Sequence, residues 1–296
     1  MAILAAVWGA SYMFIEIALD GGLADPFIVF ARTALGALVL APVALRRGAF
    51  AAARRRLGWL ALVALVQIVA PFLLITVGQH HVASSLAGIL VASAPIFTAL
   101  IAAVVVQSER LGGMGTAGLV LGFAGIGLLF GVDLGGDGDA VLGGLGILLA
   151  SLGYAVGALV AKRRLAGVPP VGVAASIMAL SALFLLPALP FALPAESPGL
   201  GVAAALLVLG AGGTGVAFLI FYTLNAEIGP GRASVVAYIA PVFSVLYGVT
   251  LLDEPFTAGT AGGLLLILVG SWTAADGRVP WRRRSPAAAV PVRTPA

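Results

Sequence analysis

The residues from His81 to Arg110 read HVASSLAGILVASAPIFTALIAAVVVQSER, and a similar stretch, EIGPGRASVVAYIAPVFSVLYGVTLLD, runs from Glu227 to Asp253. An Ala-Pro-x-Phe sequence stands at the centre of each stretch. Its proline is Pro95 in the first and Pro241 in the second, 146 positions later. A repeat at this long period predicts that the chain is built from two copies of one structural unit.

The offset of 146 extends well beyond this motif. It pairs Trp8 with Tyr154, Phe72 with Phe218 and Gln79 with Asn225, and after the loss of one residue an offset of 145 pairs Glu109 with Glu254. We therefore expect a first unit over residues 1–133, a second over residues 134–276, and a basic tail over residues 277–296.

Composition indicates that the protein lies in a membrane. Hydrophobic residues make up 61% of the chain, charged residues only 9%, and the mean hydropathy is +1.14. A soluble domain is about one-quarter charged. With no cysteine and two histidines the chain offers few metal ligands, so we expect no metal and no cofactor.

Ten apolar runs are long enough, at about 20 residues, to cross the hydrocarbon core as helices. They cover approximately residues 2–19, 27–45, 58–78, 83–106, 112–132, 141–161, 171–193, 201–224, 232–252 and 256–275. No alternating period indicates a barrel, and lipid admits only helices or closed barrels. The expected fold class is an all-α integral membrane protein with ten transmembrane helices.

Positive charge predicts the orientation, because short cytoplasmic loops retain Lys and Arg. If the N-terminus is cytoplasmic, fifteen of the sixteen basic residues fall in inner loops or in the tail, and none falls in an outer loop. The basic pI of about 10.0 therefore reflects topology, and we expect no nucleic acid as a partner. Ten helices place both termini in the cytoplasm. Five helices per unit make the second unit inverted relative to the first, as in secondary transporters that work by alternating access.

These features together resemble the EamA-type branch of the drug/metabolite transporter superfamily. The resemblance is carried by the five-plus-five helices, Trp8-Gly9 with Phe14, Pro26-Phe27 with Arg32, the two Ala-Pro-x-Phe helices, and the acids Glu109 and Glu254 that follow them. It implies a secondary carrier in the cell (inner or plasma) membrane, often an exporter of amino acids or other small metabolites, and not an enzyme.

Two charged residues lie inside the apolar runs, where charge is costly and usually functional. Glu16 lies near the outer end of the first helix, and Arg32 lies at a similar depth in the second. Three interpretations stay open. The two form a structural ion pair, Glu16 carries a coupling proton, or Arg32 binds a substrate carboxylate.

Polar, aromatic and proline residues near the middle of the helices form the candidate substrate pocket, since carrier sites lie near the midplane beside interrupted helices. They are Trp8, Tyr12, Gln67, Ser93, Pro95, Tyr154, Tyr238 and Pro241. Trp8 and Tyr154 correspond across the repeat and are expected to face one another. Both prolines are expected to kink their helices. For each residue taken alone, simple packing is the competing interpretation.

The glycines leave further alternatives open. The stretch 210–215, GAGGTG, is either a loosened backbone beside a cavity or a packing surface, and the glycines of the fifth and tenth helices favour close helix contact. A membrane enzyme or a lipid-handling protein remains the alternative to a transporter of small molecules. The expected partners are a small-molecule substrate and the lipid bilayer, with a proton as coupling ion and a homodimer left open.

Overall fold

The computed structural model describes residues 1–105, 112–228 and 235–274. Glu109, which the repeat pairs with Glu254, and the basic tail 277–296 lie outside the described residues. The helical segments are α1 (Ala2–Asp20), α2 (Asp25–Arg46), α3 (Ala49–Arg54), α4 (Leu57–Val63), η1 (Ala64–Val69), α5 (Ala70–Gly78), α6 (Ser84–Val91), α7 (Ala94–Val105), α8 (Gly113–Val132), α9 (Gly138–Arg164), α10 (Pro170–Leu185), η3 (Leu186–Phe191), α11 (Leu200–Leu207), η4 (Val208–Val216), α12 (Ala217–Ile228), α14 (Val235–Leu251) and α15 (Ala258–Ala274).

The expected all-helical membrane fold is confirmed. Consecutive segments join into eight apolar spans of 18 or more residues within the described chain, and α14 and α15 are two shorter apolar helices. The described spans lie within a few residues of the ten runs expected from hydropathy. This agreement follows from the solvent, because each helix must satisfy its own backbone in hydrocarbon.

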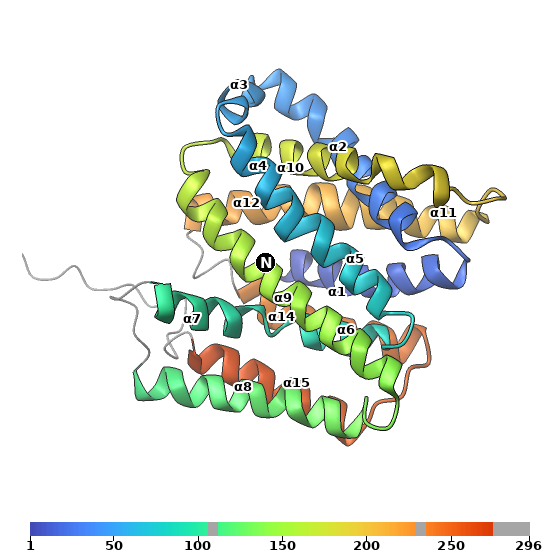
Figure 1. Ribbon diagram of the computed structural model, residues 1–296, viewed down its shortest axis with the longest axis vertical. Coiled ribbons are helices and arrows are strands. Elements are labelled where there is room, and N and C mark those ends of the chain that lie inside the picture. Colours follow the sequence, from blue (N-terminus) through green and yellow to red (C-terminus); the bar gives the residue numbers. More distant parts are fainter. Residues whose placement is uncertain (106–111, 229–234, 275–296) are drawn as a thin grey trace, which may run out of the picture.

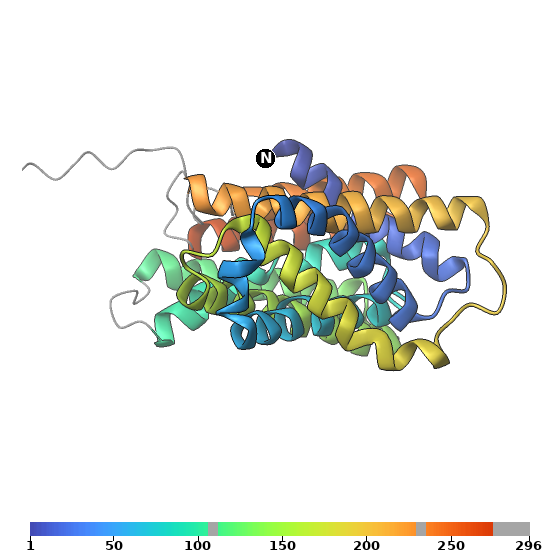
Figure 2. The ribbon, with the colours of Figure 1, turned by 90° about the horizontal axis from the view of Figure 1, so that it is seen from above.

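The helices pack in pairs that link the two parts of the chain. In Figure 1, α8 and α15 lie side by side at the bottom, while α2 and α10 lie at the top. Between them α1 packs against α14, and α9 packs against α5, α6 and α7. Figure 2, turned by 90°, shows the flattened bundle from above. This contact pattern is reciprocal, as an internal two-fold relation would produce.

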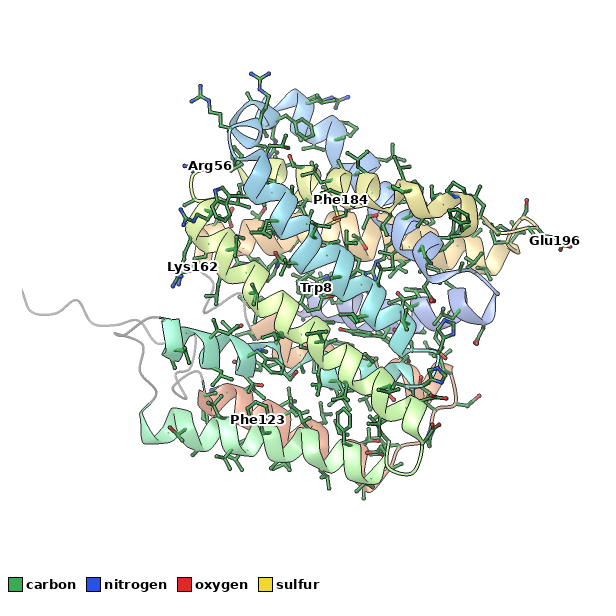
Figure 3. The ribbon with its side chains drawn as sticks, in the orientation of Figure 1. Trp8, Arg56, Phe123, Lys162, Phe184 and Glu196 are labelled. Carbon is green, nitrogen blue, oxygen red and sulfur yellow. The ribbon has the colours of Figure 1, made fainter. Side chains whose placement is uncertain are left out.

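Basic and acidic residues lie at opposite ends of the bundle. Figure 3 shows Arg56 and Lys162 at one end and Glu196 at the other. At the end that carries Glu196, His80 Nε2 lies 2.8 Å from Oδ1 of Asp25, the first residue of α2, in an ion pair. The separation matches the distribution of charge that the sequence assigns to the two sides of a membrane.

Glycines let α8 and α15 approach closely. A Cβ built on Gly270 would lie 2.6 Å from the Cα of Gly122 and 2.7 Å from the carbonyl oxygen of Gly118. Both distances are far inside normal van der Waals contact, and both involve backbone atoms that cannot rotate away. The expected packing role of these glycines is therefore confirmed.

The two Ala-Pro-x-Phe helices differ in the structure. The first is interrupted, because α6 ends at Val91 and α7 begins at Ala94, next to Pro95. The second, α14, runs as one helix through Pro241. The expected kink is thus a break in the first copy only.

Hydroxyl groups explain how the first copy tolerates this break. Ser93 Oγ donates to the carbonyl of Leu90 at 2.6 Å, and Ser151 Oγ on α9 donates to the same carbonyl at 3.2 Å. Ser271 Oγ on α15 donates to the Ala92 carbonyl at 3.3 Å. Carbonyls freed in lipid need such partners.

Candidate functional site

Arg32 lies inside the bundle on α2, with 4% of its surface exposed. Its Nε donates a hydrogen bond to Thr214 Oγ1 in η4 at 3.1 Å. Its Cζ lies 3.6 Å from the centre of the Phe72 ring on α5, close enough for a cation–π interaction. The guanidinium is thus held by a hydroxyl from the second part of the chain and an aromatic face from the first.

Glu16 has a separate set of contacts. Gln79 Nε2, at the end of α5, lies 3.2 Å from Glu16 Oε2 and also donates to the Tyr12 carbonyl at 2.9 Å. Gln79 itself is 3% exposed, so it fixes the carboxylate from the interior side. Asp20, Glu254 and His80 are near enough to act on the charge of Glu16.

The structure does not join Glu16 to Arg32 in an ion pair. Between described residues the ion pair present is that of His80 with Asp25. The two side chains have different surroundings, because α1 packs mainly on α14, whereas α2 packs mainly on α10 and η4. Sequence spacing carried no information on the rotation of each helix about its axis, which decides the partner of each side chain.

Aromatic residues border Arg32. Tyr12 on α1 and Tyr154 on α9 both lie close enough to interact with its charge. Trp8 borders the same apolar cluster as Tyr154, but its ring contacts are with Phe218 and Phe221 on α12, at centroid distances of 5.7 and 5.1 Å.

The described residues include two π-helical segments, η1 (Ala64–Val69) and η4 (Val208–Val216). The segment η4 packs against α2, which carries Arg32, whereas η1 packs against α9 and α10. The offset of 146 carries residues 64–69 onto residues 210–215, so the segments occupy equivalent places in the repeat. In η1 the widened turn precedes Pro71, whose ring crowds the carbonyl four residues back. In η4 Thr214 Oγ1 donates to the Leu209 carbonyl at 2.9 Å.

Gln67 lies in η1 and is 4% exposed. Its Oε1 accepts a hydrogen bond from the Tyr222 hydroxyl on α12 at 3.3 Å. The glycine stretch 210–215 lies within the π-helical segment η4 and packs tightly on α2, as the packing interpretation predicted. A Cβ on Gly210 would lie 3.1 Å from the Cα of Arg32.

The remaining predicted pocket residues are engaged in packing. Ser93 is fully buried with its hydroxyl on the Leu90 carbonyl, and Pro95 flanks the break that this bond supports. The Tyr238 hydroxyl donates to the Ser271 carbonyl at 3.3 Å. Pro241 is buried inside α14.

Glu254 makes a contact that the sequence did not reveal. Its two carboxylate oxygens accept hydrogen bonds from the backbone N–H groups of Ser84 and Ser85, at 2.8 and 2.9 Å. Ser244 Oγ on α14 adds a bond to the Ser84 carbonyl at 3.0 Å. The acid thus caps the N-terminus of α6, which belongs to the other part of the chain, where negative charge is favourable. The sequence paired Glu254 with Glu109, but pairing within a repeat identifies no contact.

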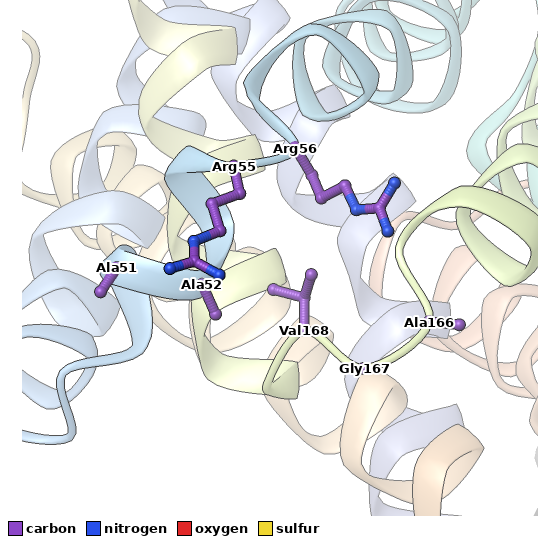
Figure 4. Close-up of a pocket in the computed structure, with 7 residues that line it drawn as sticks. All are labelled: Ala51, Ala52, Arg55, Arg56, Ala166, Gly167 and Val168. Atoms are coloured by element: carbon purple, nitrogen blue, oxygen red, sulfur yellow. The ribbon is translucent and has the colours of Figure 1, made fainter.

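A hollow of about 390 Å³ lies at the basic end of the bundle, away from Arg32. Figure 4 shows Arg55 and Arg56 above the loop at Gly167 and Val168. None of the predicted pocket residues lines it. Within the described residues, no three His, Asp or Glu side chains gather as a metal site would require.

Comparisons with known proteins agree with this architecture. The sequence profile of the EamA-like transporter family matches residues 1–131 and again residues 141–275. The uncharacterised transporter YvbV of Bacillus subtilis is 28% identical over 284 residues, which cover 90% of this chain and 88% of that protein. An uncharacterised transporter of Archaeoglobus fulgidus is 26% identical over 197 residues, or 66% of this chain and 69% of that protein.

A solved crystal structure has the same fold, with a TM-score of 0.62 at 24% identity, covering 91% of this chain and 96% of the other. The family profile spans nearly all of the described residues in two successive matches, separated by residues 132–140, which contain the turn between α8 and α9. The protein is a multi-pass membrane transporter, and it belongs to the EamA-like transporter family.

Proposed function

We propose that this chain is a secondary active transporter of small metabolites that works by alternating access. The observation that carries the proposal is the pair of π-helical segments, η1 and η4, at equivalent places of the repeat, with the buried Arg32 bonded to η4. π-Helical turns are frequent at functional sites, and carriers bind their substrates near interrupted helices where the two repeats meet.

The contacts between the two parts of the chain support a mechanism of rocking. At the end of the bundle that carries the acidic loops, Glu254 and Ser244 hold the start of α6 through the Ser84 backbone. Opening this end requires these hydrogen bonds to break. At the level of Arg32, the bond to Thr214 also joins the two parts and changes when they move.

The orientation that we propose places both termini in the cytoplasm of a cell whose plasma or inner membrane holds the protein. Basic residues such as Arg56 and Lys162 then lie at the cytoplasmic end, and Glu196 lies at the opposite end (Figure 3). We also propose that the first five-helix unit ends at residue 133 and that the second begins at residue 134, in the turn between α8 and α9.

Glu16 is the proposed site of proton coupling. Among the described residues, no cationic side chain pairs with its carboxylate, which receives one hydrogen bond, from the neutral Gln79. Asp20 and Glu254 add negative charge nearby, and His80 lies on the same side. Such a carboxyl group can exist in both protonation states as its end of the bundle opens and closes.

Untargeted mass spectrometry of the culture medium tests the proposal. Cells that express the intact chain are compared with cells that express Glu16→Ala/Arg32→Ala, and with cells that express Arg46→Ala as a matched control at the exposed end of α2. We expect one class of metabolite to accumulate outside cells with the intact chain and the control variant. Equal amounts of folded protein are verified by size-exclusion chromatography of a fluorescent fusion.

Purified protein in proteoliposomes then separates transport from other activities. Saturable counterflow of the identified metabolite supports a carrier. Identical media in all strains, together with no saturable counterflow of any solute, would refute the proposed function. Redistribution of lipid without solute flux would favour the lipid-handling alternative instead.

A further inference from the structure

Arg32 is a buried cation that has no anionic partner among the residues that the structure describes. Its side chain is 4% exposed, and no carboxylate of a described residue lies within ion-pair distance. Desolvation of an unpaired charge costs several kcal/mol, and charges inside a membrane protein are almost always paired. The neutral contacts with Thr214 and Phe72 offset part of this cost and leave the positive charge uncompensated.

The hydrogen bond to Thr214 also decides which side of the guanidinium is available. It occupies Nε, while the two Nη nitrogens make no hydrogen bond to a described residue. These nitrogens are not fully enclosed by the described residues, although the side chain as a whole is buried. The free edge formed by the two Nη nitrogens is the one that binds a carboxylate with two parallel hydrogen bonds.

Two further donors border the same charge. Tyr12 and Tyr154 lie near enough to Arg32 for electrostatic interaction, and their hydroxyl groups make no hydrogen bond to a described residue. They come from α1 and α9, one helix from each part of the chain. Tyrosine hydroxyls and a guanidinium edge together suit an oxygen-rich anionic group.

A buried cation stands at this position in the first copy of the repeat and not in the second. The offset of 146 places Met178 at the position that corresponds to Arg32, and Met178 is fully buried in α10. A single positive charge in a medium of low dielectric is best neutralised by a single negative charge. A carboxylate supplies one, whereas a phosphate monoester dianion would leave one charge in excess.

We propose that the free edge of Arg32, flanked by Tyr12 and Tyr154, binds the carboxylate of a small metabolite that bears one such group. The inference rests on the proposed transport function and deepens it, since it names the chemical class of the cargo. Thr214 is a positioning residue, because it holds Nε and thereby turns the Nη edge toward the carboxylate.

Matched pairs of compounds test this inference on the purified full-length protein. The panel contains the common amino acids and simple monocarboxylates, each beside its carboxamide, with sugar phosphates as a separate arm. Binding is measured by the shift of the thermal midpoint and by displacement of the best radiolabelled acid. We expect at least one acid to bind, and its carboxamide to bind at least about 30-fold more weakly.

Variants then assign the preference to Arg32. Arg32→Gln should lower the affinity for the acid at least about 30-fold and abolish the difference between acid and amide. Arg32→Lys retains the charge without the fork, and it should bind the acid with intermediate affinity. Arg46→Gln, on the exposed end of the same helix, should bind as the unmodified protein does.

If Arg32→Gln fails to fold, the inference is tested by the preference of the unmodified protein for acids over their carboxamides. Equal binding of acids and amides, tighter binding of phosphates, or stabilisation by no acid of the panel would overturn the inference. Saturable counterflow of an uncharged or cationic solute would do the same while leaving the transport function intact. Absence of saturable counterflow for every solute would instead refute the transport function.

Discussion

Replacement of Glu254 tests the contact that joins the two parts of the chain at the end with the acidic loops. Its carboxylate accepts from the N–H groups of Ser84 and Ser85 at 2.8 and 2.9 Å, and it lies against Gly248 of α14. Glu254→Ala leaves the first N–H groups of α6 without this cap. Glu254→Gln keeps the volume and one acceptor oxygen.

The expected cost follows from these bonds. Each contributes about 1 kcal/mol net, because Glu254 is half-buried and water competes. The negative charge at a helix N-terminus adds about 0.5 kcal/mol. We therefore expect Glu254→Ala to lower the free energy of unfolding by about 2.5 kcal/mol, and Glu254→Gln, which loses one bond and the charge, by about 1.5 kcal/mol.

Reversible unfolding in mixed detergent and dodecyl sulfate micelles, followed by tryptophan fluorescence, measures these differences. Asp253→Asn is the matched control, since it removes a neighbouring exposed carboxylate and Asn tolerates the positive φ of 53° at this position. It should change stability by less than about 0.5 kcal/mol.

A loss below about 0.5 kcal/mol for Glu254→Ala would refute the reasoning, because surface substitutions without specific contacts fall in that range. An equal loss for Asp253→Asn would also refute it, since it would show that net charge, and not the cap on α6, carries the effect.

Three further predictions concern the interior. Gly270→Ala should destabilise the protein by at least about 2 kcal/mol, because its Cβ would meet the backbone of α8, and a thermal midpoint unchanged from that of the unmodified protein would contradict the close packing. Glu16→Gln should abolish dependence of flux on a proton gradient and leave counterflow intact; unchanged dependence of flux on pH would exclude Glu16 as the coupling site. Thr214→Val should weaken binding of the carboxylate about tenfold by releasing Arg32 Nε, while Thr214→Ser restores it, and equal affinities in both variants would exclude the positioning role.

Local information in the sequence was sufficient for the membrane spans. Hydropathy and loop charge depend on short windows, and lipid imposes the same helical solution on each apolar run. For this reason the ten runs agree with the described helices. The offset of the repeat likewise pairs residues 64–69 with residues 210–215, which lie in η1 and η4.

The contacts between helices could not be predicted from the sequence. Counting residues along a helix places Glu16 and Arg32 at one depth, but their rotation about the helix axes gives them Gln79 and Thr214 as partners. The motif predicted the same kink at Pro95 and Pro241, yet only the first helix breaks. There a hydroxyl at Ser93 and two more from distant helices satisfy the freed carbonyls.

The sequence by itself determined that this protein is a helical membrane transporter with a duplicated unit and two charges in its interior. Only the tertiary structure decided that no acid of the described residues pairs with Arg32, that Glu254 caps a helix of the other part of the chain, and that the Ser93 hydroxyl bonds a backbone carbonyl. The physical reason is that apolar burial in lipid is specified residue by residue, whereas the partners of buried polar groups depend on how helices distant in sequence face one another.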